Sequence, residues 1–568
     1  MINGARMLLE CLHKVGVTDI FGYPGGAVIP IYDEIYSFEK IKHYFARHEQ
    51  GAVHAADGYA RVSGKVGVCL ATSGPGATNL VTGIMTAHMD SIPLLAITGQ
   101  VRSNLLGRDA FQETDIVGIT VPITKGNYLV QNIKDIPRII KEAYFIASTG
   151  RPGPVLVDIP NDIQQQEISY EEFNKLFDKE VQLEGYDPTY VGHPVQIKRA
   201  LSLIKKAKKP LIIAGAGVIK SQASKELFEL ANKMDMPVTT TLLGLGAFPE
   251  NHDLSLGMLG MHGTVPANYA TDEADLVIAA GIRFDDRIAG NPSKFCERAK
   301  IIHIDIDPAE IDKNKKADVP IVGDLKNVLS EINKELEPQD HKEWTDKVKE
   351  WKKEYPLAHR DVGKDKLLPQ EVLKAINDIL DGDTIVVTDV GQHQMWAAQY
   401  MTYKNANSIV TSGGAGTMGF GVPAAIGAQV GARDKKVVLI VGDGGFQMTL
   451  EEIMMIRQYN LPVKIVIINN SFLGMVRQWQ ELFKDRRYSF VDLECNPDFV
   501  KIADAYGIKS ERLKTKADLE NKLKDLILSD EGVILDCIVE KEENVFPMIP
   551  AGKTVSQMIG KKGVLEND

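Results

Sequence analysis

The sequence predicts an α/β fold made of parallel sheets in three domains. Runs rich in β-branched residues alternate with helical patterns along most of the chain, which is typical of parallel strands joined by crossover helices. A chain of 568 residues is also too long for one hydrophobic core. Two polar, charge-rich segments interrupt the alternation, at residues 162–190 and 337–366. We therefore expect three doubly wound parallel-sheet domains, at about 1–180, 190–345 and 365–545, and a C-terminal tail at 546–568.

Nine segments carry the strand pattern most clearly: 65–71, 93–98, 155–159, 210–214, 276–280, 301–306, 384–388, 436–441 and 463–468. One helix is expected to begin near Arg47, and another to cover 446–459. Trp344 and Trp351 are seven residues apart, as on one helix face, and we interpret them as packing residues. The first and third domains both contain a strand that runs into a Gly-rich turn. A duplicated cofactor-binding fold and two unrelated α/β domains both explain this likeness.

Composition excludes several classes of protein. A net charge of −11 argues against a nucleic-acid partner or an anionic membrane surface, because both need clustered basic charge. The five cysteines are odd in number and scattered, without a CxxC pattern, which argues against zinc and disulfide frameworks. No apolar run approaches the length of a membrane span, and the N-terminus lacks the features of a signal peptide. We expect a cytoplasmic protein.

The clearest functional segment is Gly442-Asp443-Gly444, followed after twenty-four residues by Asn469-Asn470. Each part follows a buried strand pattern, and ligands of parallel sheets bind beyond the carboxyl ends of strands. A carboxylate and an amide oxygen suit Mg²⁺, and glycines let the backbone approach a diphosphate. A Gly-rich turn with Asn and Asp caps is the alternative. The spacing favours the first interpretation, because it resembles the thiamine-diphosphate signature.

Other segments make the resemblance closer. They include Arg47-His48-Glu49-Gln50-Gly51, Ala71-Thr72-Ser73-Gly74-Pro75-Gly76, Met258-Leu259-Gly260-Met261-His262, Arg283-Phe284-Asp285-Asp286-Arg287, Gly391-Gln392-His393-Gln394-Met395-Trp396 and Gly474-Met475-Val476-Arg477-Gln478-Trp479. Along nearly its whole length the chain resembles the catalytic subunit of the acetohydroxyacid synthase (acetolactate synthase) family. The resemblance implies a pyrimidine-binding first domain, an FAD-binding central domain and a diphosphate-binding third domain.

The resemblance assigns the thiamine-diphosphate site residue by residue. Glu49 would be the acid against the aminopyrimidine, although on sequence alone it reads as a solvated first-turn acid. Met418 would bend the cofactor. Asp443, Asn470 and the carbonyl of Phe472 would bind Mg²⁺, although Ser471-Phe472 replaces the acidic and glutamine residues common in relatives. The remaining cofactor contacts would be Gly391, Gln392, His393, Gly416, Gly444 and Gly445.

The segment Arg283–Arg287 accompanies FAD in biosynthetic members of the family. Without the resemblance, it would be an exposed loop with ion pairs. By the resemblance, the FAD contacts would be Arg151, Gly215, Gly217, Thr241, Arg283, Arg287 and Asp305. The overall reaction involves no net oxidation or reduction, so this flavin would be structural or vestigial.

The resemblance also implies which residues would contact the substrates. Phe111 and Gln112 match a substrate-side pair of the family, and Met475 and Trp479 would form the wall of an acceptor pocket. Arg283 would bind the acceptor carboxylate. Asn161 stands where many relatives carry Lys at the channel mouth. The implied reaction decarboxylates pyruvate and joins the two-carbon unit to pyruvate or 2-ketobutyrate, the first common step of branched-chain amino-acid biosynthesis.

Because Glu49 and Asp443 fall in different domains, the resemblance also implies a homodimer or tetramer with active sites between subunits. The sequence leaves open which acceptor is preferred and whether a small regulatory subunit binds. It also leaves three alternatives open: an FAD-free catabolic acetolactate synthase, another thiamine-dependent 2-ketoacid decarboxylase, oxidase or glyoxylate carboligase, and an inactive regulatory paralogue.

Overall fold

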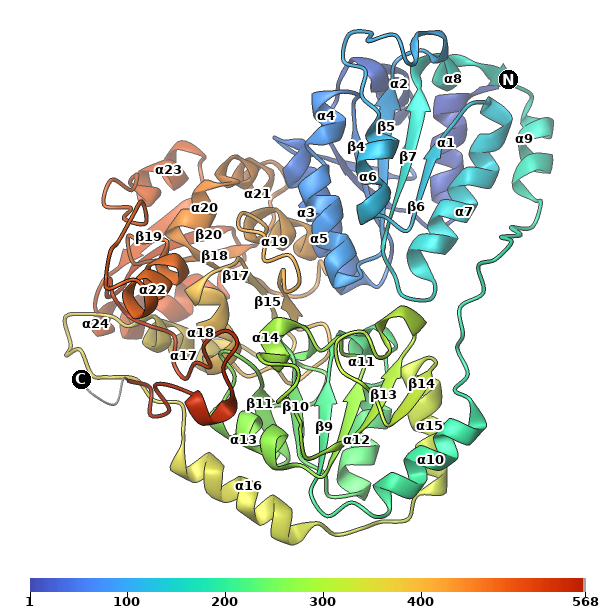
Figure 1. Cartoon of the computed structure of the whole chain (residues 1–568). Helices are drawn as coiled ribbons and strands as arrows, with labels where there is room; N and C mark the ends of the chain where they lie inside the picture. Colours follow the sequence, from blue (N-terminus) through green and yellow to red (C-terminus); the bar gives the residue numbers. More distant parts are fainter. Residues whose placement is uncertain (565–568) are drawn as a thin grey trace.

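The computed structural model describes residues 1–564 and contains three six-stranded sheets, in each of which every strand pair is parallel. Figure 1 shows three lobes, one around each sheet. The predicted fold class is confirmed. All nine predicted strands are present. The last four residues of the predicted C-terminal tail, 565–568, lie outside the described part of the chain.

The N-terminal sheet has the order β3-β2-β4-β5-β7-β6. Helices α1, α2 and α7 pack against one face, while α3 and α5 cover the other. The strands are β2 (Asp19–Gly22), β3 (Lys42–Phe45), β4 (Gly67–Ala71), β5 (Leu94–Gln100), β6 (Gly126–Leu129) and β7 (Pro154–Pro160), and the helices are α1 (Gly4–Lys14), α2 (Ile29–Tyr36), α3 (Glu49–Ser63), α5 (Val81–Asp90) and α7 (Ile136–Ser148). Beyond α9 (Tyr170–Phe177), an extended segment leads to the middle lobe (Figure 1).

The middle sheet has the order β11-β10-β9-β12-β13-β14. Its strands are β9 (Pro210–Ala214), β10 (Val238–Thr240), β11 (Ser255–Met258), β12 (Leu276–Ala280), β13 (Lys300–Asp305) and β14 (Val319–Val322), and its main helices are α10 (Pro194–Ile204), α12 (Ser224–Lys233), α13 (Val265–Glu273), α15 (Leu325–Glu335) and α16 (Lys342–Glu354). Trp344 and Trp351 lie on α16, are both buried, and belong to the core of this lobe. The indole N–H of Trp344 donates to the Pro210 carbonyl at 2.9 Å. Their interpretation as packing residues is confirmed.

The C-terminal sheet has the order β16-β15-β17-β18-β20-β19. Its strands are β15 (Ile385–Thr388), β16 (Ile409–Val410), β17 (Val437–Gly442), β18 (Lys464–Asn469), β19 (Lys509–Leu513) and β20 (Val533–Ile538), and its main helices are α17 (Pro369–Ile379), α18 (Gln392–Tyr400), α19 (Gly421–Gly431), α21 (Ile453–Tyr459), α22 (Gly474–Phe483) and α23 (Phe499–Ala505). Counted along each domain, this is the same strand order as in the N-terminal sheet. The common order supports duplication of one fold.

One predicted element is wrong. Residues 446–459 do not form a single helix: α20 (Asp443–Gln447) ends early, and a 3₁₀ turn, Leu450–Glu452, precedes α21. The Glu452 carboxylate in that turn is fully buried and accepts from the backbone amides of Arg47 and His48, at the start of α3. An unbroken helix would not present this carboxylate to two backbone donors of another domain.

Helices α3 and α19 hold the N- and C-terminal lobes together through one shared core. A Cβ added to Gly427 would lie 1.8 Å from the Ala55 carbonyl oxygen, and one added to Gly58 would lie 2.1 Å from the Ala424 carbonyl oxygen. Only glycine permits backbones to approach this closely. Figure 1 shows both helices between the two sheets.

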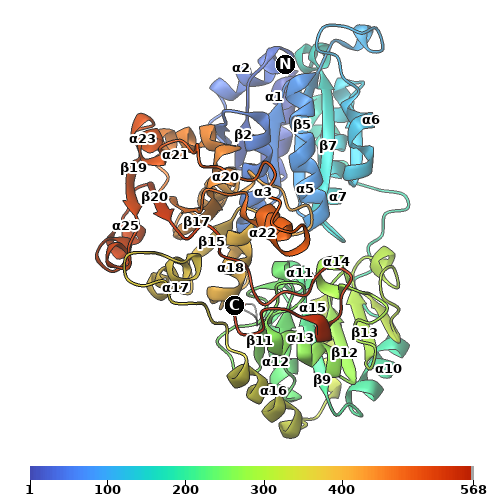
Figure 2. The same ribbon diagram turned by 60° about the vertical axis from the view of Figure 1, so that its left-hand side comes forward.

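The segment after β20 returns to the middle lobe. The Ile549 amide donates to the Met261 carbonyl at 2.7 Å, and Phe546 and Met548 pack with Met261. Figure 2 shows this segment running along the middle lobe. Among residues 1–564, none of the helices has the length and apolar character needed to cross a membrane.

We expect Gly427→Ala to lower the free energy of unfolding by about 3 kcal/mol, because the added methyl group forces α3 and α19 apart. Gly26→Ala is the matched control, since nothing lies within 4 Å of its added Cβ. The comparison uses thermal denaturation followed by circular dichroism. Equal unfolding temperatures for the two variants would contradict the close packing.

Candidate functional site

The C-terminal sheet reverses its strand order between β15 and β17, and ligands of open parallel sheets bind at such switch points. A pocket lies there, beyond the carboxyl ends of β15, β17 and β18. Its lining includes ten residues that the sequence singled out: Gly391, Gln392, His393, Met418, Asp443, Gly444, Gly445, Asn470, Phe472 and Met475. Gly416 lies in the same loop as Met418 and has a φ of +62°.

Asp443 begins α20 directly after β17 and is buried. Burial raises the pKa of this carboxyl to about 6, opposed by a 2.6 Å hydrogen bond from the Asn496 side chain. Asn470 also lies on the pocket and accepts from the Phe472 amide, whereas the Asn469 amide group donates to Asp536. Among residues 1–564, no group of three His, Cys, Asp or Glu side chains is placed to hold a metal ion. The C-terminal pocket offers the Asp443 carboxylate and the Asn470 side-chain amide as oxygen donors. Such mixed oxygen donors suit Mg²⁺.

His393 is buried against the backbone of Gly391 and Gly442, so it is not the surface histidine that its isolated sequence would suggest. Burial lowers its pKa to about 3, so the ring is neutral at pH 7. Its Nε2 atom has no hydrogen-bond partner within the described chain. A buried, unpartnered nitrogen on a pocket wall fits a ligand with polar groups.

The segment 411–419 brings Met418 to the pocket, near the position that a Cβ on Gly444 would occupy, at 4.0 Å from the Met418 Cε atom. Its far end is held by Asp389, whose two carboxylate oxygens accept from the Gly419 amide at 3.0 and 3.1 Å. Burial raises the pKa of Asp389 to about 7. Sequence reasoning missed Asp389, although its place directly after the predicted strand 384–388 was a usable signal.

The N-terminal sheet has its own switch point, between β2 and β4. Glu49 lies beside it as the first residue of α3. Its side chain is 8% exposed, accepts from the Asn79 amide group at 2.9 Å, and lies next to Gly76. The solvated first-turn acid is therefore excluded. Gln112, with a φ of +59°, packs against Gly74 at the same switch point.

The structure does not gather all the predicted site residues in one place. Glu49, Gln112 and Phe111 belong to the N-terminal lobe and are absent from the lining of the C-terminal pocket, and Phe111 is 87% exposed. Trp479 lies one turn beyond Met475 on α22, where it packs with Met261, Phe546 and Met548.

A second pocket lies at the switch point of the middle sheet, between β9 and β12, where the N-terminal lobe meets the middle lobe. Arg151, Gly217, Arg283 and Asp305 line it. Gly215 and Thr241 belong to the packed turns beside it, where the Thr241 amide donates to Ala214. Arg287 lies apart: it lines a neighbouring pocket with Met261 and Lys553.

Further residues of the interdomain pocket were not foreseen. Lys220 lines it, and burial, with the nearby Arg61 adding to the effect, lowers the pKa of this ammonium group to about 7. Arg151 bridges the lobes: it donates to Ser91 at 2.8 Å and pairs with Glu310 at 2.6 Å. The pocket lining thus contains three basic side chains, Arg151, Lys220 and Arg283, beside the acidic side chains Asp90, Asp305, Glu310 and Asp324.

Comparisons with known families agree with this division into three parts. The family "Thiamine pyrophosphate enzyme, N-terminal TPP binding domain" matches residues 2–119, the central domain of these enzymes matches 197–332, and the C-terminal TPP binding domain matches 389–537.

Curated relatives match over nearly the whole chain. A probable acetolactate synthase large subunit of Methanocaldococcus jannaschii is 48% identical over 98% of this chain and 95% of its own length. The acetolactate synthase large subunit of Lactococcus lactis is 48% identical, over 100% of this chain and 97% of its own. That of Corynebacterium glutamicum is 48% identical, over 98% and 90%. The chain therefore belongs to the family of acetolactate synthase large subunits, which are thiamine-pyrophosphate enzymes.

Proposed function

We propose that this acetolactate synthase joins pyruvate to a second pyruvate or to 2-ketobutyrate, with Mg²⁺ and FAD bound besides thiamine diphosphate. The observation that supports the proposal is the C-terminal pocket, where ten residues assigned from the sequence and its family resemblance line one cavity. The role of each residue below is part of the proposal.

Asp443, Asn470 and the Phe472 carbonyl would hold Mg²⁺ and, through it, the diphosphate. The charge of a divalent cation would offset the burial that raises the Asp443 pKa, so the carboxylate would be ionised in the loaded enzyme. His393, with its unpartnered Nε2 atom, would face the same diphosphate from the first turn of α18. Met418, in the segment 411–419, would contact the cofactor.

Glu49 would hold a hydrogen bond at the pyrimidine ring nitrogen. Its burial and its single amide partner, Asn79, leave one carboxylate oxygen for this task. Bound thiamine diphosphate supplies the electron sink that accepts the electron pair when a 2-ketoacid loses CO₂. On the substrate side, Arg283 would bind an acceptor carboxylate. Met475 and Trp479 would line a wide pocket that favours the larger acceptor, 2-ketobutyrate, and Phe111 and Gln112 would complete the wall.

Two copies of the chain would build each site. The diphosphate pocket is lined only by residues of the C-terminal lobe, whereas Glu49 lies at the switch point of the N-terminal lobe. The helix that carries Glu49 is fixed to its own C-terminal lobe by Glu452 and α19, so Glu49 cannot swing into its own pocket. A second copy would bring its Glu49 there. We propose a homodimer as the minimum active unit, with tetramers and a small regulatory subunit as further options.

FAD would bind in the interdomain pocket. The middle sheet has the strand order of dinucleotide-binding folds, and the pocket lies at its switch point. Three basic side chains suit the phosphates, and the Asp305 carboxylate suits a ribose hydroxyl. A flavin places the enzyme with the biosynthetic branch of the family. We also propose a cytoplasmic location, since all five cysteines are free thiols, which persist in a reducing compartment.

We expect purified protein, supplied with Mg²⁺, thiamine diphosphate, pyruvate and 2-ketobutyrate, to form 2-acetolactate and 2-aceto-2-hydroxybutyrate. Trp479→Leu should lower the share of the larger product, because the wall of the acceptor pocket loses its indole. Tyr36→Leu, at an exposed aromatic residue of the N-terminal lobe, is the control and should leave the share unchanged. Acetaldehyde or acetyl phosphate without either acetohydroxy acid would refute the proposed reaction.

Two inactive variants should complement each other. Glu49→Gln and Asp443→Asn are each expected to lose at least 99% of turnover, or about 3 kcal/mol of transition-state stabilisation. Co-expressed with different affinity tags and purified as a mixed dimer, they should regain about half of the wild-type turnover, because one of two shared sites is then intact. A mixed dimer as inactive as its parents would show that each site forms within one chain.

The purified protein should show the visible absorption of bound flavin. Arg283→Met should weaken FAD binding at least tenfold, by about 1.4 kcal/mol or more, since it removes a cation from the pocket wall. The exposed Arg298 of the same lobe gives the control Arg298→Met. Wild-type protein that binds no flavin on titration would favour the FAD-free branch instead.

A further inference from the structure

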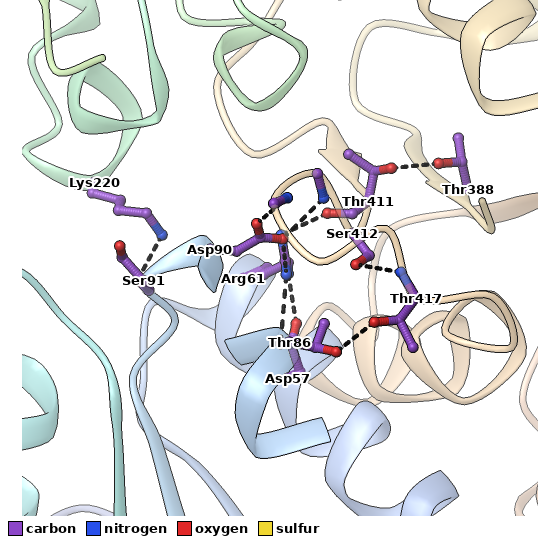
Figure 3. Close-up of polar contacts among 12 residues, drawn as sticks. Asp57, Arg61, Thr86, Asp90, Ser91, Lys220, Thr388, Thr411, Ser412 and Thr417 are labelled. Carbon is purple, nitrogen blue, oxygen red and sulfur yellow. Dashed lines mark hydrogen bonds and ion pairs between the residues drawn. The ribbon is translucent and has the colours of Figure 1, made fainter. Parts of the chain in front are cut away.

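The segment 411–419, which carries Met418, lies where all three lobes meet (Figure 3). It follows β16, and it would receive the aminopyrimidine in the proposed function. Its near end contacts two charged side chains of the N-terminal lobe, Arg61 on α3 and Asp90 at the end of α5. We name Arg61 and Asp90 the loop clamp.

The contacts of the loop clamp are direct. The Asp90 carboxylate accepts from the Gly413 amide at 3.1 Å and from the Gly414 amide at 2.7 Å. Arg61 donates to the same carboxylate at 2.9 Å and to the Thr411 carbonyl at 2.8 Å. The Arg61–Asp90 ion pair thus satisfies two backbone amides and one backbone carbonyl at the base of the loop (Figure 3).

The loop clamp is buried. The Asp90 side chain is fully buried and that of Arg61 is 8% exposed, with Asp57 on the other side of the guanidinium. Desolvation makes such buried ion pairs weak contributors to overall stability, but removing one partner leaves the remaining polar groups unpaired. The conformation of the loop in the structure therefore depends on these contacts. Further along it, the hydroxyl groups of Thr86 and Thr417 are 2.6 Å apart, which adds a second tie to α5.

The middle lobe reaches the same place. The Leu243 side chain packs against Gly413, and an Arg283 guanidinium nitrogen lies 3.1 Å from the position of a Cβ on Gly414. Lys220 donates to the Ser91 carbonyl, next to Asp90, at 2.8 Å. Asp90, Ser91, Lys220, Leu243 and Arg283 all line the interdomain pocket. Asp90 thus touches the thiamine loop and the proposed flavin pocket at once.

We propose that Asp90 is a positioning residue that couples the two cofactor sites, so that FAD in the interdomain pocket tightens the binding of thiamine diphosphate. FAD would order Arg283, Lys220 and the loop clamp, and the loop would then lose less conformational freedom when thiamine diphosphate binds. By linkage, thiamine diphosphate tightens FAD by the same factor. This inference rests on the proposed FAD site, but not on the identity of the acceptor 2-ketoacid.

The test uses full-length protein freed of both cofactors, with Mg²⁺ at a fixed saturating concentration. Calorimetry measures the affinity for thiamine diphosphate with and without FAD. In the wild type, FAD should raise that affinity at least fivefold, the lower end of common allosteric couplings. In Asp90→Asn the affinity should fall at least tenfold and FAD should change it less than twofold. The KM for thiamine diphosphate should rise accordingly, while kcat at saturating cofactor falls less than threefold.

Asp19→Asn is the matched control. Asp19 is also a buried N-terminal carboxylate that pairs with an arginine of the C-terminal lobe, Arg433 at 2.8 Å, but its hydrogen bonds do not involve the loop. The Asp19→Asn variant should have a lower unfolding temperature, but its affinities for the two cofactors and the coupling between them should be unchanged.

Two results would overturn the inference: FAD that binds to the wild type without changing the affinity for thiamine diphosphate, or equal effects of Asp90→Asn and Asp19→Asn on that affinity. Direct FAD titration and acetolactate formation by the loaded wild type are measured separately. Acetolactate formation together with uncoupled FAD binding refutes the coupling and leaves the proposed function intact. Absence of acetolactate refutes the proposed function.

Discussion

The contact between α3 and α19 is the constraint on which the rest of the structure depends. Glycine on one helix meets a backbone carbonyl of the other, at Gly427 against Ala55 and at Gly58 against Ala424, so the two helices are held at a distance that no larger residue permits. The N- and C-terminal sheets share a core around this crossing. Glu452 then caps the start of α3, and the orientation of Glu49 is set with respect to the whole molecule.

Within this fixed arrangement, the three lobes have similar sheets but different proposed roles. Each sheet places polar groups at the point where its strand order reverses: a carboxylate in the N-terminal lobe, a pocket lined by basic and acidic side chains at the middle lobe, and an Asp–Asn pair in the C-terminal lobe. The N- and C-terminal sheets have one strand order and the middle sheet another. Glu49 is absent from the lining of the Asp443 pocket of the same chain, and in our proposal a second copy supplies the missing half of the site.

The features that local sequence patterns and short motifs encode could be predicted from the sequence. The nine apolar strands and the start of α3 near Arg47 follow from apolar runs and helical patterns. Asp443 and Asn470 follow from the spacing of their motif, whereas most of the other residues of the diphosphate pocket were assigned by the family resemblance. Short or edge strands such as β10 and β16 carry too few residues for a pattern. The break at Glu452 was missed because its reason is a pair of amides some four hundred residues away. Asp90 and Arg61 were missed for the same reason, since only the folded chain brings them to Gly413 and Gly414.

The central claim is that Glu49 of one copy faces the Asp443 pocket of another. A crystal structure of the assembled protein with Mg²⁺ and thiamine diphosphate measures this most directly. The account predicts diphosphate and metal at Asp443 and Asn470 of one chain, with the pyrimidine ring nitrogen within hydrogen-bond distance of Glu49 from the other. A pyrimidine bound by Glu49 of the same chain, or one that touches no Glu49 at all, would contradict it.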